Sequence, residues 1–168
     1  MAEPALYAIG LGSNRRGRAG DPRAVVRAAL AELPGLVAAS RVIDSAPLGP
    51  SARRFANAVA LVRVPLDPPA LLAELKAIER RYGRRRGRRW GARVLDLDIL
   101  LWERGCWRSR GLVVPHAAWR TRGFVLAPLT EIAPDWRDPV TGLRVRHLRA
   151  RLTRATPAPR SHLACVGP

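Results

Sequence analysis

Two aspartates separated by a single leucine are the residues whose type and spacing point most directly to chemistry. Asp96 and Asp98 lie in the apolar run 94–101, which has the length and composition of a β-strand. Because side chains alternate between the two faces of a strand, both carboxylates share one face, with their Cα atoms roughly 6.5 to 7 Å apart. That spacing allows them to hold one hard cation or to bridge two. The same alternation predicts that the opposite face carries Leu95, Leu97, Ile99 and Leu101.

A simpler interpretation is that neighbouring arginines neutralise the two aspartates. Acidic residues are depleted in strands, however, and two of them on one face of an apolar strand cost stability unless a cation compensates their charge. A metal ion bound together with a polyphosphate would satisfy both the acids and the arginines beside them.

An arginine-rich segment runs directly into this strand. Eight of the fourteen residues from Arg80 to Arg93 are arginine, and Trp90 lies among them. Arginine binds phosphate through paired hydrogen bonds, so the segment is a natural partner for a phosphate group. The tryptophan could equally stack on a base, so the segment by itself does not separate ATP from RNA. The aspartates favour a nucleotide, because a carboxylate pair repels a nucleic-acid backbone unless a metal intervenes.

Three other places could take part in chemistry. The segment from Gly10 to Arg15 has arginine where a dinucleotide-binding fingerprint has glycine or alanine, and no Gly-Lys-Ser/Thr of a P-loop follows it. We interpret it as a tight turn after a strand. For His116, a structural and a functional role are equally open. Arg122 and Phe124 stand at the start of a predicted helix, where an anionic group is favoured.

Length and composition indicate one soluble globular domain. The chain has 168 residues, 48% of them hydrophobic and 26% charged, which excludes a wholly disordered protein. No apolar run approaches the ~20 residues that span a bilayer, no leader pattern opens the chain, and two cysteines cannot form a disulfide framework. We therefore expect a cytoplasmic protein without a membrane partner, with its domain in residues 1–152 and a basic, flexible tail in residues 153–168. Its 30 basic residues, of which only Lys76 is a lysine, give a formal net charge of +17 that attracts polyanions.

The elements that must position these residues alternate between strand and helix. Two Asp-Pro pairs, at residues 21–22 and 67–68, are typical of a helix N-cap followed by proline at the first helical position. The βαββαβ order predicts an α+β, ferredoxin-like (split βαβ) fold, with two helices covering one face of an antiparallel sheet. The expected elements are a strand at 6–11, a helix at 21–33, strands at 36–45 and 55–64, a helix at 67–83, a strand at 94–102, a helical region from about 116 that includes 124–132, and a short helix at 143–152.

Taken in chain order, the motifs resemble those of one family, the hydroxymethyldihydropterin pyrophosphokinases of folate biosynthesis. The resemblance covers about residues 5 to 136, and its most specific block is Arg-Trp-Gly-x-Arg-x-x-Asp-Leu-Asp at residues 89–98. It implies a ferredoxin-like fold and transfer of pyrophosphate from MgATP to the hydroxymethyl group of 6-hydroxymethyl-7,8-dihydropterin, giving AMP and the pterin diphosphate. The other matching motifs include Gly10-Leu11-Gly12-Ser13-Asn14, Pro47-Leu48-Gly49-Pro50, Phe55-x-Asn57, Ile78-Glu79, Val114-Pro115-His116 and Arg122-Gly123-Phe124.

The resemblance also implies roles for individual residues. Asp96 and Asp98 would hold two magnesium ions on the ATP triphosphate, and Arg84 and Arg93 would be the catalytic, phosphate-handling arginines. ATP contacts are implied for Lys76, Glu79, Arg84, Trp90, Arg93, Leu97, Ile99, His116 and Arg122. Pterin contacts are implied for Pro47, Leu48, Phe55, Asn57 and Phe124.

A function of another class stays open from the residues alone. A basic nucleic-acid-binding module can share the ferredoxin-like topology, as many RNA-binding domains do. This chain lacks the aromatic strand motifs of such domains, so we expect small-molecule substrates, no nucleic-acid partner and a monomer.

Overall fold

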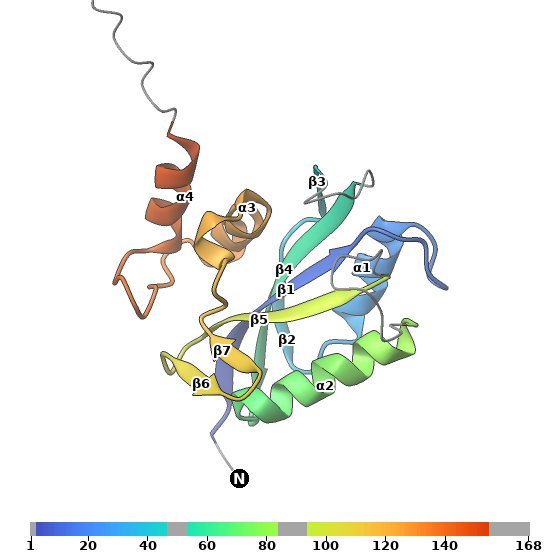
Figure 1. Ribbon diagram of the computed structural model, residues 1–168, viewed down its shortest axis with the longest axis horizontal. Helices are drawn as coiled ribbons and strands as arrows, with labels where there is room; N and C mark the ends of the chain where they lie inside the picture. Colours follow the sequence, from blue (N-terminus) through green and yellow to red (C-terminus); the bar gives the residue numbers. More distant parts are fainter. Residues whose placement is uncertain (1–2, 47–53, 84–93, 155–168) are drawn as a thin grey trace, which may run out of the picture.

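The centre of the protein is an antiparallel sheet of five strands (Figure 1). The computed structural model describes residues 3–46, 54–83 and 94–154. The strands follow the order β2-β4-β1-β5, with β3 also paired to β4, and this is the predicted ferredoxin-like arrangement. The strands are β1 (Ala5–Ser13), β2 (Leu36–Ala39), β3 (Ile43–Ser45), β4 (Phe55–Val64) and β5 (Asp96–Trp102).

The two helices between the strands begin where the Asp-Pro pairs predict. In α1 (Pro22–Ala31) the Asp21 carboxylate accepts a hydrogen bond from the backbone N–H of Ala24 at 2.9 Å. In α2 (Pro68–Arg81) the Asp67 carboxylate accepts one from the backbone N–H of Ala70, also at 2.9 Å. Each bond satisfies a backbone donor that the helix itself leaves unpaired, a contribution of about 1 kcal/mol.

Helices cover both faces of the sheet. Buried side chains of α1 and α2 pack on one face, as the sequence predicts. The other face packs against a short 3-10 helix η1 (Trp119–Thr121) and the helix α3 (Gly123–Ile132), and a further helix α4 (Val145–Thr153) packs against α3 and η1 (Figure 1). The helical region expected from about residue 116 is therefore two elements, η1 and α3.

The prediction of one strand over residues 36–45 is wrong, because Ser40 separates β2 from β3. The backbone N–H of Ser40 donates to the Val59 carbonyl at 2.9 Å, and its hydroxyl accepts the Val59 N–H at 3.0 Å. Because the Ser40 hydroxyl, in place of its backbone carbonyl, accepts the Val59 N–H, the regular ladder stops there and resumes only at β3.

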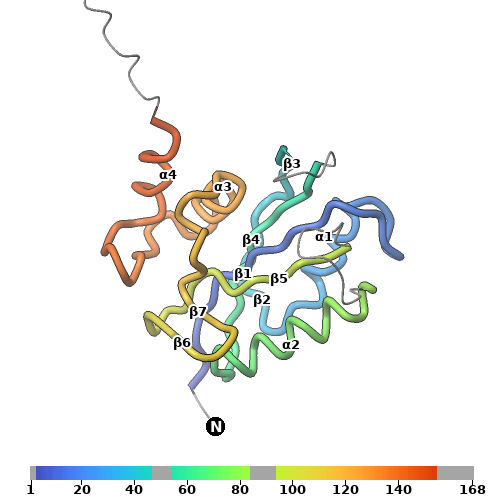
Figure 2. Tube along the Cα trace, viewed as in Figure 1, coloured from blue at the N-terminus to red at the C-terminus, as the bar shows by residue number. Residues whose placement is uncertain are grey.

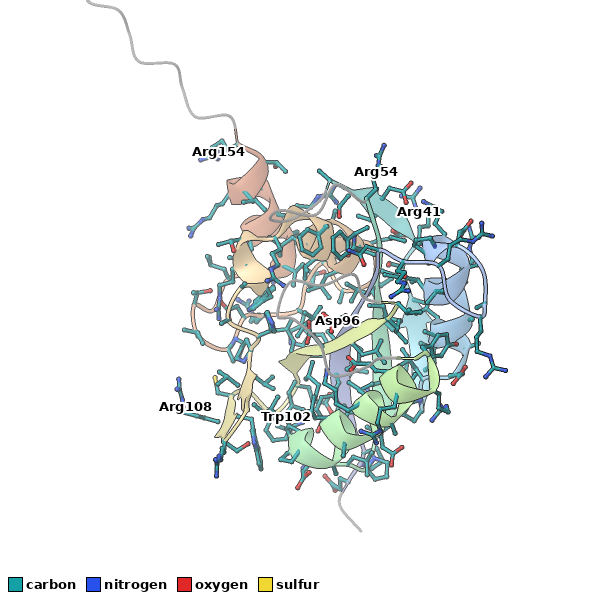
Figure 3. All side chains as sticks on the ribbon, turned by 45° about the vertical axis from the view of Figure 1, so that its right-hand side comes forward. Arg41, Arg54, Asp96, Trp102, Arg108 and Arg154 are labelled. Atoms are coloured by element: carbon teal, nitrogen blue, oxygen red, sulfur yellow. The ribbon has the colours of Figure 1, made fainter. Side chains whose placement is uncertain are left out.

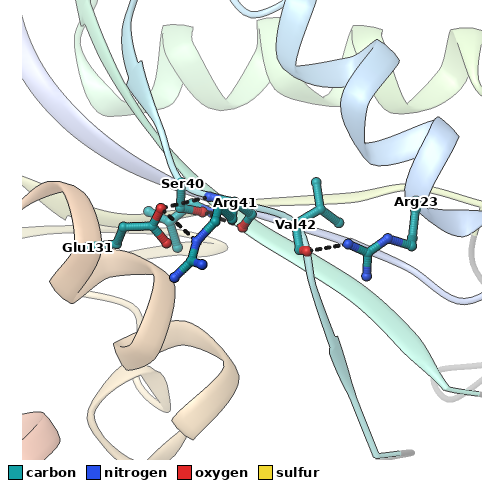
Figure 4. Close-up of polar contacts among 6 residues, drawn as sticks. Arg23, Ser40, Arg41, Val42 and Glu131 are labelled. Carbon is teal, nitrogen blue, oxygen red and sulfur yellow. Dashed lines mark hydrogen bonds and ion pairs between the residues drawn. The ribbon is translucent and has the colours of Figure 1, made fainter.

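The residues after this break are tied to helices on both sides of the sheet (Figure 4). Arg41 turns toward α3, where its backbone N–H and its Nε both donate to Glu131 Oε1, at 3.3 and 3.2 Å. On the α1 side, Arg23 Nη2 donates to the Val42 carbonyl at 2.7 Å. These contacts hold β3 against β4 although β3 has only three residues.

The interpretation of residues 10–15 as a tight turn is also wrong. β1 continues through Ser13, so Gly10 and Gly12 lie inside a strand that pairs with β4 on one side and β5 on the other. Pairing on both sides holds the chain extended despite its glycines.

A β-bulge in β5 changes the predicted alternation of its side chains. Ile9 pairs with Ile99, but Ala8 pairs with Leu101, so Leu100 is an extra residue in β5. As a result Leu101 packs with Leu100 toward α3, and the prediction that it shares a face with Leu97 is wrong. Ahead of the bulge the alternation holds, and the two aspartates share a face.

A two-stranded hairpin, β6 (Trp107–Ser109) and β7 (Leu112–Val114), is absent from the sequence prediction. It lies beside α2 and the end of β5 (Figure 2). Its Trp107 ring meets Trp102 edge to face, with 5.8 Å between centroids. Strands of three residues are too short to show a period, so only this tertiary packing defines them.

The C-terminal part of the fold ends with α4. The helix predicted at 143–152 is confirmed at Val145–Thr153, while residues 155–168 lie outside the described residues. The tail therefore stays a prediction. Among the helices of the described ranges, none combines the length and the apolar character needed to cross a membrane.

Gly35, in the turn between α1 and β2, is expected to be essential for stability. Its φ is +59°, and an added Cβ would overlap the Arg63 carbonyl oxygen, which belongs to rigid backbone. Gly35→Ala is expected to lower the free energy of unfolding by about 3 kcal/mol, the upper part of the range for single substitutions, in urea denaturation. Gly142→Ala is the matched control, because φ is +71° there and nothing lies within 4 Å of the added Cβ. The control is expected to lose only the ~1 kcal/mol of left-handed strain, and equal losses would contradict the steric argument.

Candidate active site

The polar residues of the candidate site form a row across three neighbouring strands. Asn57 on β4 pairs with Gly12 on β1, and Gly12 pairs with Asp96 on β5. In the next row, Gly10 pairs with Asp98. Directly paired residues share a face of the sheet, here the face opposite α1 and α2. Because strands lie about 4.8 Å apart, the Cα atoms of Asn57 and Asp96 are roughly 10 Å apart. Figure 3 shows Asp96 on β5, with α2 on the other side of the strand.

One of the two glycines, Gly12, leaves space beside the aspartates, whereas the Leu100 side chain fills the space above Gly10. A Cβ on Gly12 would lie 3.5 Å from Asn57 Oδ1, and one on Gly10 would lie 3.2 Å from the Leu100 side chain. Between Asn57 and Asp96 the face of the sheet is therefore bare backbone at Gly12. A sequence signal for this bare backbone was the pair of glycines at alternate positions ahead of the predicted turn. Glycine inside a strand often marks a place where a ligand or another backbone segment comes close to the sheet.

The aspartates form an electrostatically strained pair. Both are partly buried. Burial, and then the negative charge of Asp96, raise the pKa of Asp98 above its ordinary value, while His116 and Lys76 act in the opposite direction. Such a pair favours a bound cation. No group of three or more metal-binding side chains occurs in the described ranges, so a cation here would take its other ligands from water or phosphate, as magnesium commonly does.

Three predicted ATP contacts, Lys76, Glu79 and Leu97, form one hydrogen-bonded cluster. The Glu79 side chain is fully buried, and its Oε1 accepts hydrogen bonds from Lys76 Nζ at 2.7 Å and from the Leu97 N–H at 2.8 Å. Lys76 Nζ also donates to the Leu97 carbonyl at 3.1 Å. The Leu97 side chain lies in the core, as does that of Ile99, so neither side chain faces a ligand.

His116 is placed beside β5 by the segment that follows β7. Its backbone N–H donates to the Leu100 carbonyl at 3.0 Å. Its ring Nδ1 accepts the Ala118 N–H at 3.3 Å, which leaves Nε2 as the ring nitrogen that can meet a ligand. The structure thus brings His116 close enough to Asp98 to influence its pKa.

Arg122 and Phe124 stand together at the N-terminus of α3. The Arg122 guanidinium carbon lies 5.8 Å from the centroid of the Phe124 ring, a cation–π contact. The guanidinium and the positive end of the helix dipole act in the same direction and attract an anion.

Phe55 and Asn57 lie at the start of β4. Asn57 is 5% exposed, and its Nδ2 donates to Ser45 Oγ at 2.9 Å. Ser45 escaped the sequence analysis, because only the pairing of β3 with β4 brings it there. α3 packs over these two strands, so the helix that carries Phe124 covers the same region of the sheet.

Five predicted site residues lie outside the described ranges and stay predictions: Pro47, Leu48, Arg84, Trp90 and Arg93. Residues 47–53 connect β3 to β4 and residues 84–93 connect α2 to β5, so both segments adjoin strands that carry the site.

Fold and candidate site together define a class, ferredoxin-like α+β proteins with a pair of acids on one face of the last strand of the sheet. Comparison with known proteins gives the family. Residues 8–134 match the model of the 7,8-dihydro-6-hydroxymethylpterin-pyrophosphokinase (HPPK) family. Because this match spans most of the chain, the chain belongs to that family. It is a transferase of folate biosynthesis that moves a pyrophosphoryl group.

Individual relatives agree with this assignment. The chain is 45% identical over 137 residues to the 2-amino-4-hydroxy-6-hydroxymethyldihydropteridine pyrophosphokinase of Pseudomonas aeruginosa, covering 78% of this chain and 82% of the relative. It is 39% identical over 146 residues to the enzyme of the same name from Synechocystis, covering 83% and 72%. The fold resembles that of Plasmodium falciparum HPPK-DHPS, with a TM-score of 0.68 at 14% identity, over 89% of this chain and 41% of that one. These matches confirm the predicted family and fold and lend no support to the nucleic-acid-binding alternative.

Proposed function

We propose that this enzyme transfers the β- and γ-phosphates of MgATP together to the hydroxymethyl oxygen of 6-hydroxymethyl-7,8-dihydropterin and releases AMP. The row Asn57, Gly12 and Asp96 carries the proposal, because it puts an amide for a heterocycle and an acid for a metal–phosphate group on either side of bare backbone. At roughly 10 Å between the outer strands of the row, the two substrates can meet above Gly12.

The pterin binds at the β4 side of this row. Since Asn57 Nδ2 is engaged with Ser45, its Oδ1 is the atom that accepts a hydrogen bond from the N–H edge of the pterin. Phe55 and Phe124 enclose the flat ring from its two faces, and Pro47 and Leu48 complete the pocket. The aromatic contacts favour a planar ligand.

The nucleotide binds at the β5 side. Asp96 and Asp98 would hold two magnesium ions, which would neutralise the triphosphate and the charge that develops on its leaving oxygen. His116 Nε2 and the Arg122 guanidinium contact phosphate oxygens. Arg84 and Arg93 stabilise the transferred group, Trp90 stacks on the nucleotide, and the backbone of Ile99 contacts the base.

In the reaction the pterin hydroxyl oxygen attacks the β-phosphorus. The new O–P bond forms as the bond from that phosphorus to the α,β-bridging oxygen breaks, the hydroxyl proton passes to solvent, and AMP carries away the bridging oxygen. Positioning of the two substrates and stabilisation of phosphate charge supply most of the rate acceleration in such transfers.

The identity of the nucleotide product tests this proposal. We expect that purified enzyme with hydroxymethyldihydropterin, ATP and magnesium forms AMP and the pterin diphosphate in equal amounts, measured by chromatography. ADP as the main pterin-dependent product would overturn attack at the β-phosphorus. An absence of pterin-dependent ATP consumption would favour the nucleic-acid-binding alternative.

We also infer a monomeric, cytoplasmic enzyme with its catalytic domain in residues 1–152 and no nucleic-acid partner. Support comes from the site, because its described residues all belong to a single chain. Light scattering of the purified protein tests the oligomeric state, and a stable dimer would contradict the inference.

A further inference from the structure

β5, the strand that carries both aspartates, is the last strand in the sheet order. Its inner edge pairs with β1, whereas no strand of that sheet pairs with its outer edge in the described ranges. An edge strand presents backbone N–H and C=O groups that lack strand partners. The backbone position of such a strand is therefore less constrained than that of β1 or β4.

At Leu97, two side chains of α2 make the hydrogen bonds that a neighbouring strand would otherwise make. The Leu97 N–H donates to Glu79 Oε1 at 2.8 Å, and the Leu97 carbonyl accepts from Lys76 Nζ at 3.1 Å. Together they satisfy both backbone groups of the residue that separates Asp96 from Asp98. The helix carries them at positions i and i+3, which lie on one face of a helix.

The two side chains of the pair also bind each other. The Lys76 ammonium and the Glu79 carboxylate are joined at 2.7 Å, and the Glu79 side chain has no exposed surface. Short, charge-assisted hydrogen bonds in such surroundings are stronger than neutral ones. Because Lys76 is the only lysine of the chain, its occurrence here is not part of the general arginine excess.

We propose that Lys76 and Glu79 are positioning residues that hold β5 at Leu97 and thereby fix the two flanking carboxylates at the geometry of a magnesium site. This deepens the proposed function, on which it rests for the position of the metal. It differs from direct contact with ATP, the role that the family resemblance implies, because Glu79 Oε1 and Lys76 Nζ both hydrogen-bond the strand at Leu97.

The variant Lys76→Met/Glu79→Met tests the proposal, because it removes both side chains that hydrogen-bond the Leu97 backbone and removes their two opposite charges together. In the ligand-free protein, the Leu97 amide is expected to exchange about tenfold faster by NMR, the effect of losing one hydrogen bond. The magnesium concentration needed for half-maximal binding of a nonhydrolysable ATP analogue is expected to rise about 10-fold, typical of losing a group that supports metal ligands. Binding of the analogue without magnesium is expected to stay the same.

Two single variants serve as controls. Glu79→Gln keeps an acceptor for the Leu97 N–H, so both the exchange rate and the magnesium requirement are expected to stay near those of the unmodified protein. Glu103→Met is the matched control, because Glu103 Oε1 accepts the Leu6 N–H at 2.6 Å at the far end of the same sheet. It is expected to speed exchange at Leu6 and to leave the magnesium requirement unchanged.

Three results would overturn the proposal. One is faster exchange at Leu97 with an unchanged magnesium requirement, which would make the pair a support of the strand alone. Another is an equal loss of analogue binding with and without magnesium, which would indicate direct contact with ATP. If the double variant does not fold, Glu79→Gln alone decides the question. A raised magnesium requirement in Glu79→Gln with an unchanged exchange rate at Leu97 would show that the charge of Glu79 matters and the position of β5 does not. Failure of AMP formation by the unmodified enzyme would instead overturn the proposed function and leave these readouts intact.

Discussion

Asp96→Ala and Asp98→Ala are each expected to lower kcat by at least about 10³-fold, the equivalent of the several kcal/mol that metal-assisted charge stabilisation contributes to such reactions. Each substitution removes one of the two carboxylates that the β5 alternation places on the face of Asn57 and Gly12. Each variant leaves only one carboxylate to hold a metal ion and to offset its charge. Turnover is measured as pterin-dependent AMP formation at saturating magnesium.

The same substitutions are expected to leave the fold intact and the melting temperature of the ligand-free protein unchanged or higher. Burial and the neighbouring Asp96 charge raise the pKa of Asp98, so its ionised form costs more free energy in the folded protein than in the unfolded chain. Removing either acid relieves that cost. Asp135→Ala, on the exposed loop after α3, is the control carboxylate and should keep full activity. Near-normal turnover in either site variant would contradict the metal assignment.

Asp138→Ala is expected to lower the free energy of unfolding by about 3–5 kcal/mol, the usual cost of removing one partner of a buried ion pair. The Asp138 side chain is fully buried and binds both Nε and Nη2 of Arg120, at 2.7 and 2.6 Å. The Thr141 hydroxyl and the Val140 N–H donate to the same carboxylate. The Asp138 carboxylate therefore joins η1 to the loop before α4. Its loss is expected to loosen the packing of η1 and α4.

Chemical denaturation of Asp138→Ala beside Asp135→Ala checks this expectation. Asp135 is 61% exposed and pairs with Arg144 at 2.9 Å, so its loss is expected to cost less than about 1 kcal/mol. Equal losses in the two variants would show that burial does not decide the effect.

The Asp138 pair also predicts a dependence on pH. Burial alone would raise the pKa of Asp138, but the hydrogen bonds from Arg120 and Thr141 outweigh it and hold the pKa below its ordinary value. A lowered folded-state pKa stabilises the protein above the ordinary carboxyl pKa of about 3.9. That stabilisation is lost as the pH falls through the lower folded-state value. Asp138→Ala should therefore show a smaller loss of stability on acidification than the unmodified protein.

Much of the candidate site is readable in the sequence because its signals are local. The alternation Asp96-Leu97-Asp98 sets both carboxylates on one face of any strand, whatever that strand pairs with. The Asp-Pro pairs at residues 21–22 and 67–68 define helix starts through bonds that span three residues. The family motifs add the identity of the substrates, which no local rule contains.

What the sequence by itself determined was therefore the longer helices and strands, the shared face of the acids and the family. The tertiary structure decided how rows of residues meet across strands: that Gly12 separates Asn57 from Asp96, that Leu100 bulges and turns Leu101 toward α3, and that Lys76 and Glu79 close the open edge of β5. The physical reason is the range of the interactions. Helix caps and side-chain alternation act within a few residues, whereas strand register and edge closure depend on contacts between residues far apart in the chain, which a one-dimensional pattern does not record.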